Sequence, residues 1–514
     1  MGAVRQLAQE SHHSAARPSS IQWHHGSCAR HHRGHDGQVA GRRPHETPMF
    51  ELARDSTVPL VDQICERVTQ LVRHGQLPAG VRLPSIRKLA RQVRASPFTV
   101  VDAYDRLVAR GVIESRAGRG FFVMRRPPSA PLAAIEALPD LGSDALALAQ
   151  FCLTQRADVI PAGSGFLPEN WLLEAAPGGV LARLVRGRRT QPWLPCEPQG
   201  LPELREQIAS RLVQNGIAAG PANIVTTYGA SQAFDLLARI LLAPGDAVLV
   251  EDPGYFVLFE QLRAHHVRLI PVPRHADGPD LEALEAACRA HRPRAFFMQT
   301  LLHNPTGSSA DAAHCHRILS LAEQYGFAVV EDDVYGDLHE GPAVRLAQID
   351  GLRHVIYVGS YTKLIGPALR VGYVAAEGAL VTQLIERKVL TVLSGSTLLE
   401  CFVSEVLDGG RYKKHVERLR LRLARMRRDA RAGLESAGIE FDSAPGEGIF
   451  LWGRVPDAVP VDGLARRARD HSILLARGAL FSAAESCNQW LRFNVAHSAS
   501  PPLVEFLRES LRAA

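Results

Sequence analysis

The stretch GSYTKLIGPALRVGY, Gly359 to Tyr373, ends an apolar run with a lysine between a serine and an arginine. Lys363 stands three residues after Ser360 and seven before Arg370. An isolated lysine after a strand is usually a solvated surface charge. A nucleophilic lysine instead needs neighbours that bind an anion, supply a carboxylate and donate hydrogen bonds. The rest of the chain therefore decides whether Lys363 is a surface charge or a nucleophile.

Composition places the chain among ordinary globular proteins. Its 514 residues predict two to four domains, with 46% apolar and 22% charged residues. The net charge of +6 is too small to indicate a polyanionic partner unless it is clustered. The eight cysteines form no CxxC pair, and no apolar run reaches membrane-spanning length, so we expect a cytoplasmic protein without a structural metal or a membrane span.

The first 48 residues differ from the rest. They are rich in His, Arg, Gly and Ser, show no helical or strand period, and predict a disordered extension. Their histidine pairs lack cysteine or carboxylate company, which argues against a dedicated metal site. Apolar patterning begins after Met49, and we hypothesise that Met49 is the native start and that residues 1–48 are not native.

Residues 57–124 carry the pattern of three helices and a hairpin. A first helix places apolar residues on one face, Ser85 opens a second, and a third ends at Gly111. The segment VIESRAGRGFFV then predicts two strands around Gly118 and Gly120. This arrangement is the winged helix-turn-helix. The residues expected to face its core from the third helix are Val100, Tyr104, Leu107 and Val108.

Three further regions follow. Residues 125–158 mix Pro, Ala and Leu without periodicity and predict a linker. Over residues 159–393, buried-type runs such as DAVLVED and FAVVEDD alternate with amphipathic helices, which predicts a large α/β domain with a parallel sheet covered on both faces. Residues 394–514 predict a smaller α+β domain.

Candidate partners for Lys363 occur along the α/β region. The glycine turn at Gly229, Ala230 and Ser231 opens a helix whose free N–H groups can bind a phosphate. Ser360 and Arg370 are spaced to add a hydroxyl and a guanidinium to the same anion.

The remaining needs of a lysine that forms a Schiff base with pyridoxal phosphate (PLP) also have candidates. Asp332 ends a strand, where its carboxylate would keep the ring nitrogen protonated. Asn304 and Tyr335 can hydrogen-bond the ring oxygen, and Tyr255 can stack on the ring. These residues favour the nucleophile over the surface charge.

The motifs YGASQA, EDPGY, HNPTG, EDDVY, SYTKLIGPALRVGY and LRFNVA occur in an order that resembles the fold-type I aminotransferases. This resemblance covers residues 160–497 and implies that Lys363 carries PLP. It also implies that Arg492 binds the α-carboxylate of an amino substrate or effector. The alternative for Arg492 is a surface arginine on an edge strand.

The front of the chain resembles the winged helix of the GntR regulators, on the segments LPSIRKLA and TVVDAYDRLVARG. The resemblance implies a double-stranded DNA operator, with the third helix in the major groove and the wing on the adjacent backbone or minor groove. The residues expected at the DNA are Arg82, Ser85, Arg87, Ser96, Phe98, Thr99, Arg116, Gly118 and Arg119.

Together the two halves resemble the MocR subgroup of the GntR regulators. That resemblance implies a head-to-tail homodimer that regulates transcription in response to PLP or an amino compound. The alternatives are a working class I/II aminotransferase with an accessory DNA-binding domain, and a DNA-binding scaffold that holds no cofactor. Retention of Lys363, Asp332, Tyr335 and Arg370 argues against the scaffold.

Four positions qualify the resemblance. Pro97 replaces an arginine common early in the recognition helix, which puts the matching guanine contact in doubt. Pro195 stands where aminotransferases often have a tyrosine, which weakens the enzymatic interpretation. Regulators that sense γ-aminobutyrate carry a basic residue near the position that Phe256 occupies in this chain, so we do not expect γ-aminobutyrate as the effector. Asn304 matches true aminotransferases and favours catalytic competence.

Overall fold

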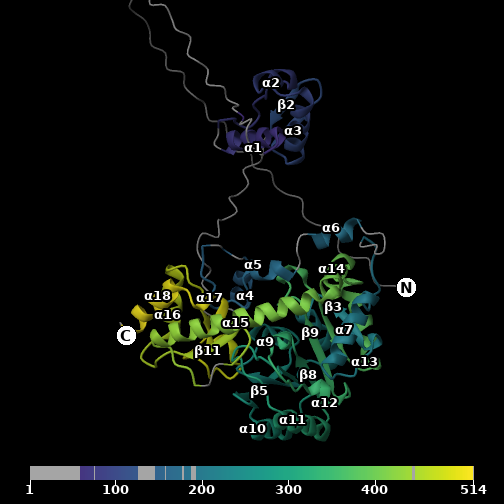
Figure 1. The fold of residues 1–514 in the computed structure, drawn as a ribbon, viewed down its shortest axis with the longest axis vertical. Helices are drawn as coiled ribbons and strands as arrows, with labels where there is room; N and C mark the ends of the chain where they lie inside the picture. The colour runs from purple at the N-terminus through teal and green to yellow at the C-terminus, as the bar shows by residue number, and fades with distance from the viewer. Residues whose placement is uncertain are drawn as a thin grey trace, which may run out of the picture. The chain divides into compact units, whose positions relative to one another are not determined.

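The computed structural model describes residues 58–73, 76–124, 145–154, 158–175, 179–186, 193–442 and 446–512, together with Leu52 and Arg156. The chain divides into two compact units, residues 1–133 and 134–514, both drawn in Figure 1. The predicted extension at residues 1–48 and the hypothesis about Met49 lie outside the described residues.

The first unit is the predicted winged helix-turn-helix. Its elements are α1 (Leu60–Arg73), α2 (Ile86–Gln92), α3 (Pro97–Ala109), β1 (Ile113–Arg116) and β2 (Gly120–Val123). Ser85 caps α2, accepting from the Lys88 N–H, and Ser96 caps α3, accepting from the Thr99 N–H. Strands β1 and β2 pair antiparallel across a turn that contains Gly118. The capping serines therefore set where the two helices begin.

The core of this unit lies between the three helices and the wing. Residues Val100, Ala103, Tyr104 and Leu107 of α3 are fully buried, which is the i, i+3, i+4, i+7 spacing of one helical face. The prediction that Val108 faces the core is wrong, since 37% of its surface is exposed. Ala103 fills the core instead, because Val108 lies one position past the buried stripe.

The second unit is built on a sheet of eight strands. Strands β4 to β9 run parallel where they pair, except the short β6, and β10 pairs antiparallel with both β3 and β9. The strands in their order across the sheet are β3 (Ile224–Thr227), β10 (Gly372–Ala375), β9 (Val355–Ser360), β8 (Ala328–Asp332), β7 (Ala295–Met298), β4 (Ala247–Asp252), β5 (Arg268–His275) and β6 (Gly278–Pro279).

Helices cover both faces of this sheet (Figure 1). Successive strand residues such as Val329 and Val330, or Phe296 and Phe297, are buried in different hydrophobic clusters because side chains alternate between faces. The helices are α7 (Pro202–Gln214), α8 (Gly229–Leu241), α9 (Phe256–Ala264), α10 (Leu281–His291), α11 (Ala312–Tyr325), α12 (Leu346–Asp350) and α13 (Gly378–Val392).

The carboxyl ends of neighbouring strands bring the candidate residues to one edge. Strand β8 ends at Asp332 and β9 ends at Ser360, three residues before Lys363. Strand β3 leads through Tyr228 into α8, and β4 leads towards Tyr255. Ligands of open α/β sheets bind at this edge.

A smaller α+β part follows the large sheet. Its three-stranded antiparallel sheet has the order β11 (Phe450–Arg454), β13 (Trp490–Asn494), β12 (Ala476–Arg477). Its helices are α14 (Thr397–Leu407), α15 (Arg411–Ser436), α16 (Val461–Asp470), α17 (Val495–Ser498) and α18 (Pro501–Arg512). Segment 160–163 joins it, because Ile160 forms a bridge with Ile473 and the Gly163 N–H donates to the Leu474 carbonyl.

The structure differs from the predicted linker at residues 145–154. They form helix α4 (Ala145–Thr154), whose Ala145, Leu148 and Phe151 are buried with Phe256 and Phe481 in one hydrophobic cluster. The pattern of alternating Ala and Leu has no polar face, which hid the helical period. Two short helices, α5 (Glu169–Leu172) and α6 (Gly179–Arg186), lie further along the chain.

Candidate functional site

A cavity of about 400 Å³ opens at the carboxyl edge of the large sheet. This volume falls within the range of small-molecule sites. The predicted residues that line it are Ala230, Ser231, Tyr255, Asn304, Asp332, Tyr335, Ser360, Lys363, Arg370 and Arg492. The structure thus brings together side chains that are up to 262 positions apart, from Ala230 to Arg492.

Lys363 projects into this cavity rather than into bulk solvent. Its Nζ lies 3.5 Å from the Gly165 carbonyl oxygen and 4.4 Å from the centre of the Phe166 ring. Burial, together with the positive charges of Arg492 and Arg370, lowers the pKa of Lys363 to about 8. A substantial fraction of the amine is therefore neutral, and nucleophilic, near physiological pH.

The start of helix α8 forms one end of the cavity. No side chain caps this helix, so its first N–H groups remain available for an anion. The Arg370 Nη2 donates to the Tyr228 carbonyl at 3.0 Å, which holds its guanidinium at the helix start. Gly229 has φ +74°, and a Cβ there would lie 2.9 Å from the same Nη2. Only glycine lets Arg370 approach this closely.

Thr362 completes this end of the cavity and was missed in the sequence. Its Oγ1 is buried and has no hydrogen-bond partner among the described residues, and it lies 3.3 Å from the position of a Cβ on Gly229. A buried hydroxyl without a partner costs free energy unless a ligand satisfies it. Its position directly before Lys363 was the signal in the sequence that could have found it.

Asp332 lies at the other end of the cavity. It is 5% exposed, and burial raises the pKa of its carboxyl to about 7. The Gln299 Nε2 donates to its Oδ2 at 2.9 Å and the Val334 N–H donates to its Oδ1 at 3.2 Å. Among the described residues no cationic side chain forms an ion pair with it. A protonated ring nitrogen would supply the missing positive partner.

Gln299 is a second residue that the sequence did not single out. Gln299 follows the end of strand β7, in the same way that Asp332 stands at the end of the neighbouring strand β8. Its Oε1 accepts a hydrogen bond from the Asn304 N–H at 2.7 Å. It therefore fixes the Asp332 carboxylate and the Asn304 loop relative to each other. Its position after a buried strand was the signal that could have found it.

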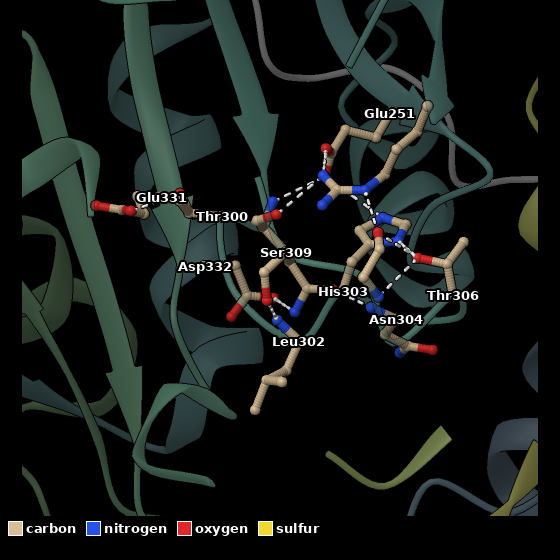
Figure 2. Close-up of polar contacts among 12 residues, drawn as sticks. Glu251, Thr300, Leu302, His303, Asn304, Thr306, Ser309, Glu331 and Asp332 are labelled. Carbon is tan, nitrogen blue, oxygen red and sulfur yellow. Dashed lines mark hydrogen bonds and ion pairs between the residues drawn. The ribbon is translucent and has the colours of Figure 1, made fainter. Parts of the chain in front are cut away.

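Two buried glutamates, Glu251 and Glu331, accept hydrogen bonds from the loop that contains Gln299 and Asn304. Figure 2 shows the polar contacts of this loop. The Thr300 hydroxyl donates to Glu331 Oε1 at 2.5 Å, and the Gln299 N–H donates to Glu251 Oε2 at 2.8 Å. Glu251 also pairs with buried Arg274. Burial lowers the pKa of neighbouring His303 well below its usual range, so its ring stays neutral. This network makes the loop rigid.

Arg492 forms the floor on the side of the smaller sheet. It is 2% exposed, and its guanidinium lies 4.4 Å from the Phe450 ring centre and 4.7 Å from that of Phe481. Its Nη1 donates to Asn304 Oδ1 at 2.8 Å and its Nη2 to the Gly163 carbonyl at 2.6 Å, while Nε has no partner among the described residues. The alternative of a surface arginine is wrong.

The two predicted tyrosines lie on the walls. Tyr335 is 3% exposed and packs edge-on against Phe450, and burial raises its pKa far above the usual range. Burial and the Asp332 charge raise the pKa of Tyr255 to about 12. Both phenols therefore keep their protons and can donate hydrogen bonds.

Helix α4 supplies a wall that the sequence did not predict. Ala149, Cys152 and Leu153 line the cavity together with Phe166 and Phe256. The sequence predicted this segment to be part of a linker, so none of its residues is among the predicted site residues. Only the packing of α4 against the α9 region brings it to the cavity.

In the winged-helix unit the candidate DNA residues lie on the surface. Phe98 is 85% exposed in the first turn of α3. Ser96 and Thr99 are joined by a hydrogen bond of 2.9 Å between their hydroxyls, so they also serve the helix cap. Ser85 and exposed Arg87 mark the start of α2.

A second group of candidate DNA residues lies on or beside the wing, which consists of strands β1 and β2. Arg82 forms a bridge with Phe122, and its guanidinium approaches Gly120. Arg116 pairs with Glu114 at 2.6 Å and stacks over the Phe122 ring at 4.6 Å. Exposed Gly118 and Arg119 form the turn between the strands. The structure thus places Arg82 and Arg116 on the same small sheet.

Two family models match the chain. Residues 60–123 match the model described as "Bacterial regulatory proteins, gntR family", and residues 194–507 match "Aminotransferase class I and II". The "Probable rhizopine catabolism regulatory protein MocR" of Rhizobium meliloti is 28% identical over 72% of this chain and 76% of its own. The chain belongs to the class I and II aminotransferase family and carries a GntR-family domain in front of it, which is the architecture of a GntR regulator of the MocR type.

Two further similar proteins match either most of this MocR-type regulator or a smaller share of its chain. The "Uncharacterized HTH-type transcriptional regulator YdcR" of Escherichia coli (strain K12) is 29% identical over 84% of this chain and 94% of its own. The solved structure of LysN, an alpha-aminoadipate aminotransferase from Thermus thermophilus, is 26% identical with a TM-score of 0.65. It covers 71% of this chain and 94% of LysN, which supports the predicted fold-type I architecture.

None of the helices in the described parts of this MocR-type regulator combines the length and the apolar character needed to cross a bilayer.

Proposed function

We propose that this MocR-type regulator binds PLP through Lys363 and binds an operator in double-stranded DNA through its winged helix. In this proposal, PLP or an amino compound in the cavity changes the affinity for the operator. The observation that carries the proposal is a PLP-type cavity around Lys363 in the same chain as a GntR winged helix.

PLP, when bound, supplies an aldehyde that captures amines and a ring that withdraws electrons from them. The first N–H groups of α8, the hydroxyls of Ser231, Ser360 and Thr362, and the Arg370 guanidinium suit the phosphate. Neutral Lys363 is the nucleophile for the aldehyde.

The other end of the cavity suits the ring. The Asp332 carboxylate suits a protonated ring nitrogen, and Asn304 and Tyr335 donate to the ring oxygen. The Asn304 side-chain NH₂ is available because its Oδ1 accepts from Arg492. Tyr255 suits one face of the ring. The unpartnered Thr362 hydroxyl and the unpaired Asp332 carboxylate support this fit.

The DNA role rests on the exposed face of the winged helix. The start of α3, with Ser96, Phe98 and Thr99, suits the major groove. The arginines of α2 and the wing suit phosphates, which position the domain without reading sequence. They are Arg82, Arg87, Arg116 and Arg119.

A homodimer is part of the proposal, since winged-helix operators commonly have two-fold symmetry. The aminotransferase-like unit exposes apolar side chains in two adjoining segments, and the Thr397 hydroxyl donates to the Leu194 carbonyl at 2.6 Å between them. Such a patch marks an interaction surface. Its members are Trp193 (72% exposed), Leu194 (56%), Leu390 (76%) and Leu393 (71%).

A second candidate function is amino transfer. Asn304, Arg492 and a lysine with a pKa near 8 are the groups that an aminotransferase uses to bind and deprotonate its substrate. The winged helix would then be an accessory domain. A regulator and an enzyme differ in what substitution of Lys363 changes.

The test combines visible spectroscopy with DNA binding by the full chain. PLP is added to wild-type protein and Lys363→Ala, with Lys413→Ala, an exposed lysine on α15, as the matched control. Affinity for the upstream DNA of its own gene is titrated at one salt concentration with and without PLP, because phosphate contacts depend on salt.

The regulator predicts a visible absorption band in wild type and Lys413→Ala but not in Lys363→Ala. It also predicts that PLP changes DNA affinity only in the two proteins that show the band. A band together with amino-donor turnover and no PLP effect on DNA binding would favour the enzyme. Absence of the band in wild type would overturn PLP binding.

A further inference from the structure

More residues line the cavity than the proposed contacts with PLP use. After the residues proposed for the phosphate, the ring nitrogen and the ring oxygen, a mainly apolar part of the lining remains. Its members are Ala149, Cys152, Leu153, Gly165, Phe166, Phe256 and Val257. This surface is where an amino compound would lie.

Two fixed points orient such a compound. A Cβ on Gly165 would lie 3.7 Å from Lys363 Nζ and 3.9 Å from Arg492 Nη2, so Gly165 separates the amine from the guanidinium. Arg492 uses two of its five N–H donors in the hydrogen bonds to Asn304 and Gly163, which leaves donors for a carboxylate. An α-amino acid therefore fits with its carboxylate at Arg492 and its amino group towards Lys363.

The side chain of the amino acid must then meet the remaining wall. Cys152 lies beside Gly165 and its thiol stays neutral, because burial raises its pKa. Leu153 lines the cavity yet is 66% exposed, an apolar side chain that a ligand would cover. Phe256 and Val257 of α9 add further apolar surface.

This wall offers no cation for a second carboxylate. Among the described lining residues only Lys363, Arg370 and Arg492 are cationic, and each has a proposed partner. A carboxylate placed against Cys152 and Leu153 would be desolvated without a counter-ion. An apolar side chain would instead cover Leu153 and gain hydrophobic contact.

The wall is also held in place. Helix α4 buries Leu148 and Phe151 against Phe256 and Phe481, so Cys152 and Leu153 are presented from a packed helix. A fixed apolar wall discriminates by side-chain character more sharply than a mobile loop.

We infer that the effector is an α-amino acid with an uncharged, apolar side chain, whose side chain lies against Ala149, Cys152 and Leu153 of α4 and against Phe256 and Val257. This inference rests on the proposed function and names the ligand class of the same cavity. It makes α4 the specificity element of the site.

The experiment titrates PLP-loaded full-length protein with L-leucine, L-methionine, L-glutamate and L-2-aminoadipate. Changes in the visible band report binding in the cavity, and affinity for operator DNA is the second readout. Wild type is expected to bind the two apolar amino acids at least about tenfold more tightly than the two acidic ones, because the wall lacks a counter-ion.

One variant and one matched control sharpen the test. Leu153→Arg adds a cation at the cavity mouth and is expected to raise the affinity for the acidic amino acids about tenfold while lowering that for leucine. Leu421→Arg places the same change at a side chain that is 73% exposed on α15, outside the cavity lining, and should leave all four affinities as in wild type.

The outcomes separate this inference from the proposed function. If wild type binds glutamate as tightly as leucine, if Leu153→Arg leaves their ratio unchanged, or if the band responds to none of the four, the inference is overturned while PLP binding stands. If PLP produces no band at all, the proposed function fails and this inference fails with it.

Discussion

Phe98 in the winged helix exposes 85% of its surface, whereas Asp332 and Arg492 in the cavity expose 5% and 2%. The DNA face presents side chains to solvent and relies on helix caps such as Ser96 to position them. In the cavity, buried hydrogen-bond partners hold the side chains in place. Gln299 donates to Asp332, and Arg492 donates to Asn304. Single changes should therefore have large effects in the cavity and modest ones on the DNA face.

The largest expected effect concerns protons in the cavity. Because only the neutral amine of Lys363 attacks, the rate at which the visible band develops after PLP is added should rise about tenfold per pH unit from pH 6, and level off near the pKa of about 8. Stopped-flow absorbance measures this rate. The lysine of a model peptide, with a pKa of 10.5, is the control and should continue to accelerate to pH 10. A rate for the protein that also rises to pH 10 would contradict the burial of Lys363.

Gly229→Ala should come next, with PLP affinity lowered about 30-fold. The added Cβ would displace the Arg370 guanidinium, and a hydrogen bond to a charged group contributes roughly 1.5–3 kcal/mol to binding. The left-handed φ of +74° adds a cost to folding that the control variant shares. The matched control is Gly326→Ala, where φ is +71° and no atom lies within 4 Å of the added Cβ. Fluorescence titration with PLP should show the loss only at Gly229. Equal affinities for the two variants would exclude a steric role for the close approach.

Thr362→Val should lower PLP affinity about tenfold, since a hydrogen bond to a charged group contributes roughly 1.5–3 kcal/mol and valine keeps the shape. The expectation follows from the buried Thr362 Oγ1 that lacks a partner among the described residues. Thr391→Val on α13, whose hydroxyl bonds only backbone carbonyls of its own helix, is the control. Unchanged affinity in Thr362→Val would show that this hydroxyl does not face the phosphate.

Phe98→Ala should have the smallest effect. Phe98 is apolar and lies at the start of α3, where it suits the methyl group of a thymine. Replacing that thymine by uracil should weaken wild-type binding about fourfold, the value of one methyl group, and should leave Phe98→Ala unaffected. Fluorescence anisotropy measures both, with Val108→Ala near the end of α3 as the control. If no thymine in the operator shows this dependence, Phe98 does not read a methyl group.

The difference between the two regions also explains what could be predicted. Local signals were sufficient for the winged helix, because Ser85 and Ser96 lie directly beside the helix starts that they cap. The exception, Val108, lies at the edge of the buried stripe, where periodicity alone does not separate inside from outside. For the cavity, the residues that follow apolar strands, such as Asp332, were found by their position at strand ends.

The residues that were missed share a physical cause. Gln299 acts through its hydrogen bond to Asp332, and Thr362 lies beside Gly229, so both depend on residues that are distant in sequence. An amide or a hydroxyl after a strand has no composition signal of its own. Cys152 and Leu153 belong to α4, whose alternating Ala and Leu indicated a linker. Their place in the cavity depends on the packing of α4 against α9, which no local pattern encodes.

The amino-acid sequence by itself determined the two-part architecture, the candidate set of Lys363, Asp332 and Arg370, and the membership of the chain among MocR-type regulators, because these depend on local patterns and on motifs in a fixed order. Only the tertiary structure decided that Arg492 is buried beside Asn304 and that α4 closes the cavity with an apolar wall. Burial and electrostatic environment arise from elements that are distant along the chain, and the pKa of Lys363 near 8 is their combined product.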